Sequence, residues 1–231
     1  MIKKLLLSIA PVLVLASFAV MPAFAQAQTT AYGTCETGEP QEFPPCPEGE
    51  KKFKAFTTTP VKVVDQKAIG NGNFILTDKV TGGKIECEGL ISTGTDKNTA
   101  GVGESAETLS FHHCFTIFEG KRCRVSTVGA GGSSIVGTVT DKVLAGGLTV
   151  QITVTGGFAL VFSGPPPTGC LPFGTKIGTV TGKATGAQAA GSNVLEFTKT
   201  KGLKLNLTDE TEFTGSVETY TEGTDKPVVI N

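Results

Sequence analysis

Apolar and polar residues alternate with a period of two along the chain from Phe53 onward. The segment 148–155, for example, sets Leu, Val, Ile and Val against Thr, Gln, Thr and Thr. This alternation is typical of strands with one buried face, and glycine-rich turns separate the runs. No segment after the N-terminal region shows a helical repeat of apolar residues. The pattern therefore predicts an all-β fold, either an antiparallel sandwich or a barrel, with about ten or more strands.

The same alternation in the segment 109–117 bears on the two histidines of the chain. Every second residue from Leu109 lies on one apolar face, which places His113 between two phenylalanines. His112 then shares the opposite face with Cys114. Because neighbouring strand residues point to opposite faces, the two histidines are badly placed to bind one metal ion. We expect His113 to be a core residue and both histidines to have structural roles.

A glycine pair separates two apolar runs and predicts a β-hairpin. A three-residue loop, Thr155-Gly156-Gly157, would pair Val154 with Phe158 and keep the apolar residues of both runs on one face. A two-residue loop would place the two apolar sets on opposite faces. Since a one-residue slip flips every side chain, we expect the three-residue loop.

The first residues of the chain read as a targeting segment. Residues 1–25 show a basic start, an apolar run and a small-x-small pattern ending at Ala25, which together are typical of a secretory signal peptide. Residues 26–52 read as a Pro- and Glu-rich arm, and residues 53–231 as the all-β domain. We expect cleavage after Ala25, with cleavage after Ala27 as the close alternative. We expect a secreted, extracellular protein, with the periplasm or cell envelope as the alternative.

Cysteine usage fits an exported protein, because disulfides persist outside the cytosol. Six cysteines are available for pairing: Cys35, Cys46, Cys87, Cys114, Cys123 and Cys170. We predict the local bridges Cys35–Cys46 and Cys114–Cys123 and the long-range bridge Cys87–Cys170. The main alternative joins Cys87 to Cys114 and Cys123 to Cys170.

Charge and composition argue against several functions. The net charge is −1 and no basic stripe occurs, which argues against a nucleic-acid partner. No apolar run after the signal approaches the roughly 20 residues that span a bilayer, so we expect no stable membrane insertion. The chain has no Trp, which weakens sugar-binding readings, and we interpret Glu86 and Glu88 beside Cys87 as a polar rim.

Motifs for secreted hydrolysis are missing from the sequence. There is neither a Gly-x-Ser-x-Gly elbow nor a His-Glu-x-x-His pair. We therefore expect no catalytic residue, no metal site and no cofactor, and a protein that is not an enzyme. The glycine-rich loops 129–134 and 164–169 are the expected contact surfaces, because loops carry function on rigid β scaffolds.

Several motifs together resemble a group of uncharacterised, secreted, cysteine-containing, β-rich bacterial proteins. They are a strand cysteine in the segment 83–87, an aromatic strand ending in Cys114 with Cys123 soon after, the segment 134–139, a hairpin leading to Cys170, and the closing segment 213–218. The Pro-rich arm departs from that pattern. The resemblance implies a disulfide-stapled β domain and no activity.

Three functions remain open at this point. The first is a non-catalytic structural or binding module of the extracellular space or cell surface, with a cell-surface or small-molecule partner. The second is a β-barrel carrier that holds a small apolar ligand against its phenylalanine-rich inner face. The third is a secreted hydrolase with an unrecognised site. A closed apolar cavity would favour the second, and a convergent polar cleft would favour the third.

Overall fold

The structure is a computed structural model that describes residues 31–36, 46, 52–65, 74–130, 132–144, 148–164, 169–189, 191–224 and 226–230. The expected signal peptide, most of the arm and residues 165–168 lie outside this part of the chain. The all-β prediction is confirmed. The strands are β1 (Tyr32–Glu36), β2 (Lys52–Ala55), β3 (Thr58–Asp65), β4 (Phe74–Asp78), β5 (Lys84–Thr99), β6 (Val102–Phe118), β7 (Lys121–Thr127), β8 (Ile135–Val143), β9 (Thr149–Thr155), β10 (Phe158–Phe162), β11 (Lys176–Gln188), β12 (Val194–Thr200), β13 (Leu203–Leu205), β14 (Asp209–Thr221) and β15 (Val229–Ile230). No helix in the described residues is long and apolar enough to cross a bilayer.

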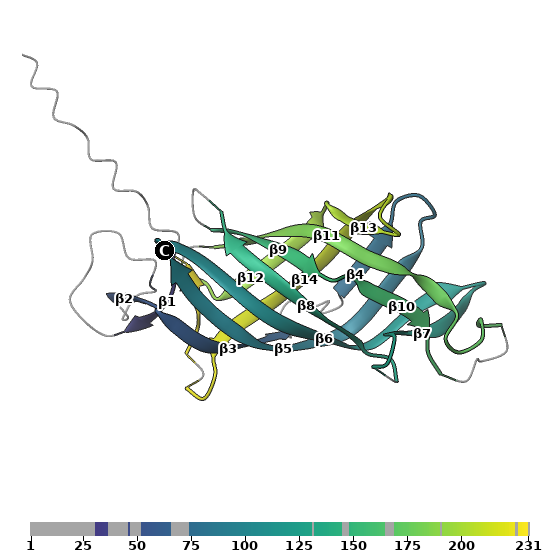
Figure 1. Cartoon of the computed structure of the whole chain (residues 1–231), viewed down its shortest axis with the longest axis horizontal. Helices are drawn as coiled ribbons and strands as arrows, with labels where there is room; N and C mark the ends of the chain where they lie inside the picture. The colour runs from purple at the N-terminus through teal and green to yellow at the C-terminus, as the bar shows by residue number, and fades with distance from the viewer. Residues whose placement is uncertain are drawn as a thin grey trace, which may run out of the picture.

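The large antiparallel sheet closes on itself as an elongated barrel (Figure 1). At one end, the eight strands β3, β5, β6, β8, β9, β11, β12 and β14 pair in a complete ring. At the other end, the ring consists of the eight strands β4, β5, β6, β7, β10, β11, β13 and β14. The long strands β5, β6, β11 and β14 belong to both rings, so they run the length of the barrel. An eight-stranded barrel has an interior just wide enough for side chains or one small ligand.

A three-stranded sheet of β15, β1 and β2 lies at the first of these ends, which we call the cap end (Figure 1). Tyr32 of β1 is buried there. The Asn98 amide of β5 holds the β1 backbone, accepting a hydrogen bond from the Tyr32 N–H and donating one to the Tyr32 carbonyl, each at 2.9 Å. The predicted Cys35–Cys46 disulfide closes the segment between β1 and β2. The cap sheet is thus bonded to the barrel wall by β5.

Glycines on the inner face make room for large side chains from neighbouring strands. A Cβ atom added at Gly137 would lie 1.9 Å from the Phe158 ring, and one at Gly215 would lie 2.4 Å from the Phe74 ring. Gly103 makes the same room for Tyr32. Glycine inside a strand commonly marks such a close approach. Each of these aromatic rings therefore lies over a glycine of a neighbouring strand, where a larger residue would clash with it.

The predicted hairpin at Gly156 and Gly157 is wrong. Strand β9 pairs with β8 and β11, whereas β10 pairs with β7 and β11, and no pairing joins β9 to β10. The two strands lie one after the other along β11, with β10 against its first half and β9 against its second. Both glycines have positive φ, at 74° and 79°, so the chain bends without folding back. The two apolar runs therefore do not pair with each other, and both pair with β11.

The expected core position of His113 is also wrong. His113 has a φ of 51°, and its side chain is 75% exposed. This left-handed residue interrupts the alternation of β6, so that Leu109 is buried before it and Cys114 is buried after it. Ile117, which shares its phase with Leu109 in the sequence, is consequently exposed. The positive φ of this one residue thus exchanges the buried and exposed positions in the second half of β6.

Cys35–Cys46 is confirmed, whereas the other four cysteines follow the predicted alternative and not the preferred pairing. Cys87 and Cys114 lie directly opposite each other on β5 and β6, with their Cα atoms 4.0 Å apart, and they are bonded. Cys123 of β7 instead lies opposite Thr116, two residues along β6 from Cys114. It bonds Cys170 in the segment between β10 and β11. Direct cross-strand pairing of Cys87 with Cys114 therefore excludes both Cys114–Cys123 and Cys87–Cys170.

Candidate functional site

The barrel encloses a cavity of about 80 Å³, given as the space open to the centre of a water molecule. This is several times the roughly 10–15 Å³ that one water needs on that measure. Every lining residue is apolar, and we call this space the apolar cavity. It is lined by Phe74, Leu76, Ile85, Cys87, Leu109, Phe111, Ile135, Val139, Ile152, Val154, Phe158, Leu160, Val180, Ala184, Leu203 and Phe213.

Aromatic rings form one wall of the apolar cavity. The ring of Phe74 meets that of Phe111 edge to face, with centroids 5.2 Å apart, and lies parallel to that of Phe213 at 6.3 Å. Phe213 also meets Phe197 edge to face at 5.2 Å. Aromatic pairs at these separations prefer such geometries and are mutually stabilising. The wall is therefore a packed cluster contributed by β4, β6 and β14, and Phe197 of β12 packs against it from outside the lining of this cavity.

Two further spaces adjoin the apolar cavity and share lining residues with it. The first, of about 50 Å³, lies toward the cap end, and we call it the acidic-end cavity because Glu107 and Asp141 line it. It shares Phe74, Leu109, Phe111, Ile152 and Phe213 with the apolar cavity. The second, of about 100 Å³, lies beside the turn from β4 to β5 and shares Leu76 and Ile85. The interior is thus apolar in its middle and acidic toward the cap.

The acidic residues are brought together by strand register. Asp96 of β5 lies opposite Ser105 of β6, and Ser105 lies opposite Asp141 of β8, so the three form one row across the barrel wall. Glu107 lies two residues further along β6 on the same face. Its partner on β5 is Gly94, where an added Cβ would lie 2.5 Å from the Glu107 Cγ atom. Only glycine at this position leaves room for the Glu107 side chain.

Hydroxyl groups link the carboxyls. Ser105 Oγ contacts Asp141 Oδ1 directly and lies 3.3 Å from Glu107 Oε1. Ser92 Oγ donates to Glu107 Oε2 at 3.2 Å, and Tyr32 donates to Asp141 Oδ2 at 3.4 Å. Ser105 has a single hydrogen for its two carboxyl contacts, so one of them requires a proton on Glu107 or Asp141. The network therefore favours a partly protonated pair of carboxyls.

Burial changes the acidity of these groups. It raises the pKa of Asp141 from 3.8 to about 6, even though hydrogen bonds from Ser105 and Tyr32 oppose the change. Burial, followed by repulsion from Asp141 and Asp96, raises the pKa of Glu107 well above its usual value. Burial and then Asp141 do the same to the pKa of Asp96. Burial also raises the pKa of Tyr32, which keeps its hydroxyl a donor.

No cation in the described part of the chain compensates this cluster. The ion pairs of that part join other residues, as when Lys97 and Lys142 contact Glu104 on the outer face of β6. No group of three or more His, Cys, Asp or Glu side chains among the described residues is arranged to hold a metal ion. Buried carboxyls without a cation are costly, and such groups concentrate at functional sites.

Sequence reasoning missed the acidic cluster, although the pattern held a signal for it. Asp141 shares the strand phase of Val139 and Val143, and Glu107 shares that of Leu109. A carboxyl in the apolar phase of a strand must be buried if the strand continues regularly. Three such residues on three strands come together only through register, which the sequence does not show.

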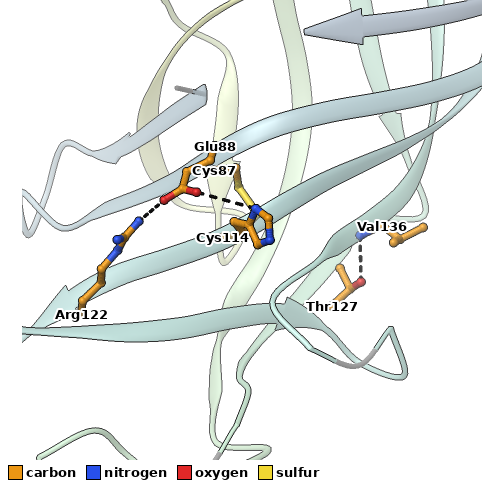
Figure 2. Close-up of a disulfide and its surroundings, with 7 residues drawn as sticks. Cys87, Glu88, Cys114, Arg122, Thr127 and Val136 are labelled. Carbon is orange, nitrogen blue, oxygen red and sulfur yellow. Dashed lines mark hydrogen bonds and ion pairs between the residues drawn. A yellow bond between two sulfur atoms is a disulfide. The ribbon is translucent and has the colours of Figure 1, made fainter. Parts of the chain in front are cut away.

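The residues that the sequence did single out lie elsewhere. Figure 2 shows the Cys87–Cys114 disulfide beside Glu88, whose carboxylate pairs with Arg122 on the outer surface. Glu88 also lies 3.7 Å from His113 Nδ1. His112 is half-buried, and its Nε2 atom has no hydrogen-bond partner. Glu86, His112 and His113 therefore do not form a common site with the cavity.

The loop 129–134 is a turn between β7 and β8, described except at residue 131, and the loop 164–169 lies mostly outside the described residues. Of the described residues in these two loops, none lines any of the three spaces. The site must therefore be interpreted from its own chemistry. The chain matches no protein-family model, no curated protein and no solved structure.

Proposed function

We propose that this protein binds a small apolar molecule inside its barrel and acts as a carrier without catalysing a reaction. The observation that supports this most strongly is the apolar cavity, which is enclosed by a complete ring of strands and lined by apolar side chains alone. Small-molecule sites are typically concave, mostly apolar and supplied with few polar groups. This is the carrier function that the phenylalanine-rich strands suggested.

Packing energetics support a ligand-binding role over a purely structural one. Protein interiors are close-packed, and unfilled volume costs stability through lost contacts. Here Ala184 of the inner face lines unfilled space, where a larger residue would pack more closely. A barrel selected for rigidity alone would gain by filling that space. Retaining it is explained by a molecule that occupies it.

Export is part of the proposal. The three disulfides are of the kind that persists in oxidising compartments. We propose that the N-terminal segment directs secretion and that the carrier works outside the cytosol, either in the extracellular space or in the cell envelope.

The test compares the same substitution inside and outside the barrel. Ala184→Leu places a larger side chain in the apolar cavity, and Ala187→Leu places it on the exposed face of the same strand. Octan-1-ol serves as a neutral apolar probe, titrated into the purified, oxidised protein by calorimetry. Circular dichroism and thermal melting establish that both variants are folded.

We expect octan-1-ol to bind the unmodified chain and Ala187→Leu equally, and to bind Ala184→Leu at least tenfold more weakly. Absence of binding to the unmodified chain would overturn the carrier proposal. Equal binding to both variants would show that the probe binds elsewhere on the molecule.

A further inference from the structure

The acidic-end cavity has a chemistry that an apolar ligand alone does not use. Glu107 and Asp141 line it, and it adjoins the apolar cavity through shared phenylalanine, leucine and isoleucine side chains. A molecule that fills the apolar cavity would therefore have one end beside these two carboxyls. This step rests on the proposed function, because it takes the apolar cavity as the place of the ligand's body.

An unsatisfied polar atom belongs to the same carboxyl cluster, next to the two carboxyls that line the cavity. Asp96 is only 2% exposed, and its Oδ2 atom has no hydrogen-bond partner. Register places it opposite Ser105, which contacts both other carboxyls. Buried polar atoms are almost always hydrogen-bonded, so an orphaned carboxyl oxygen is unusual. The cluster thus has more acceptors than the described chain has donors for them.

Every titratable group that the described residues bring to this cluster is an acid. The titratable groups are Asp96 of β5, Glu107 of β6, Asp141 of β8 and Tyr32 of the cap sheet. The remaining lining of the acidic-end cavity is contributed by β4, β5, β6, β9, β12 and β14 and is apolar except for one threonine: Phe74, Leu90, Leu109, Phe111, Ile152, Leu195, Phe197, Phe213, Val217 and Thr219. No lysine or arginine is among them.

We propose that the acidic-end cavity binds the protonated amine of a small ligand whose apolar part lies in the apolar cavity. An ammonium group has three N–H donors and one positive charge, which match the surplus of acceptors and the acidic groups that can ionise beside it. An anionic head group would be repelled by whichever of these carboxyls is ionised. A metal ion is disfavoured because the described acidic side chains are not arranged to hold one.

Binding of the amine has a defined proton balance. At pH 7 the free cluster keeps part of its protons, because ionising all of its carboxyls together in a buried site is unfavourable. When an ammonium group arrives, the carboxyls that are still protonated nearest to it ionise, and their protons leave to solvent. The ligand keeps its own proton, and no covalent bond forms or breaks. A neutral alcohol in the same place would leave the protonation of the carboxyls unchanged.

The test uses three probes with one chain length: octan-1-amine, octan-1-ol and octanoate. The amine is charged at pH 7, since alkylamines such as the lysine side chain have pKa values of about 10.4. Calorimetry at pH 7 gives each Kd, and repeating the amine titration in buffers of different ionisation enthalpy gives the number of protons released. The variant is the pair Glu107→Gln with Asp141→Asn, and the control is Glu104→Gln on the outer face of β6.

We expect octan-1-amine to bind at least tenfold more tightly than octan-1-ol, octanoate to bind most weakly, and amine binding to release protons. The double variant should lose its preference for the amine and keep its affinity for the alcohol. Glu104→Gln should bind every probe as the unmodified chain does. Equal affinity for amine and alcohol, or amine binding without proton release, would overturn the amine site and leave the carrier function standing. If no probe binds the unmodified chain, both proposals fail. The proton measurement needs no variant and decides the question even if the double variant does not fold.

Discussion

The two ends of the barrel interior bury opposite kinds of surface. Toward β4, β10 and β13, the interior consists of packed aromatic and aliphatic side chains, with the buried Cys87–Cys114 disulfide beside them. Toward the cap, the same long strands bury Asp96, Glu107 and Asp141. Apolar burial stabilises the fold, whereas buried carboxyls without a cation destabilise it. The difference indicates that the cap end is not optimised for stability alone, as the proposed amine site would require.

Removing an aromatic side chain from the apolar end should have the largest effect. Phe74 is buried and contacts the rings of Phe111 and Phe213, so Phe74→Ala should lower the free energy of unfolding by about 3–5 kcal/mol. Chemical denaturation of the oxidised protein measures this. Val80→Ala, at an exposed position just beyond the end of the same strand, is the control and should change little. A loss below about 1 kcal/mol for Phe74→Ala would contradict the packed wall.

The acidic end should make stability fall as the pH rises. The folded pKa of Asp141, about 6, lies above its ordinary value of 3.8, so the folded state holds this proton more tightly than the unfolded state does. The resulting stabilisation is complete below about pH 4 and is lost as the pH rises through 6. For Asp141 alone it is on the order of 3 kcal/mol. Asp96 and Glu107, whose pKa values are also raised by burial, add to this loss with the same sign.

Denaturation curves between pH 5 and pH 8 measure this slope. The double variant Glu107→Gln with Asp141→Asn should flatten it and be more stable than the unmodified chain at pH 8. Glu104→Gln should leave the slope unchanged, because Glu104 lies on the outer face of β6 beside Lys97 and Lys142. An unmodified chain whose stability rises steadily over this range would contradict the assignment of buried, protonated carboxyls.

The smallest effect is expected at His113, on the outer surface beside the Cys87–Cys114 disulfide. Its side chain is 75% exposed and its ion pair with Glu88 is solvent-screened, so His113→Ala should change the free energy of unfolding by less than about 0.5 kcal/mol. His113→Gly relieves the positive φ and should be neutral or slightly stabilising. A decrease of more than about 1 kcal/mol in the free energy of unfolding for His113→Ala would contradict the exposed position of this side chain.

The sequence allowed the fold class to be predicted because its period of two depends only on local alternation. Val150, Ile152 and Val154 lie on one strand, as the pattern indicated. What could not be predicted depends on backbone conformation and on partners distant in sequence. The positive φ of His113 reverses the phase of β6, and the choice of β11 as a common partner removes the hairpin at Gly156.

The candidate site was predictable only in part. Phenylalanine-rich inner faces suggested an apolar ligand, and the cavity that would hold one lies among those residues. The acidic cluster depends on the alignment of Asp96, Ser105 and Asp141 across three strands. The apolar phase of Glu107 and Asp141 marks each as buried, but nothing local marks their alignment, because register depends on partner strands distant in sequence.

The central claim is that a small apolar molecule binds inside the barrel, and methyl NMR tests it most directly. Intermolecular nuclear Overhauser effects from octan-1-ol to assigned methyl groups show where the probe lies. We predict contacts to Ile135, Ile152 and Val154, which line the apolar cavity, and none to the exposed Val80 and Val128. Contacts confined to the exposed methyl groups, or no contacts at saturating probe, would contradict the account.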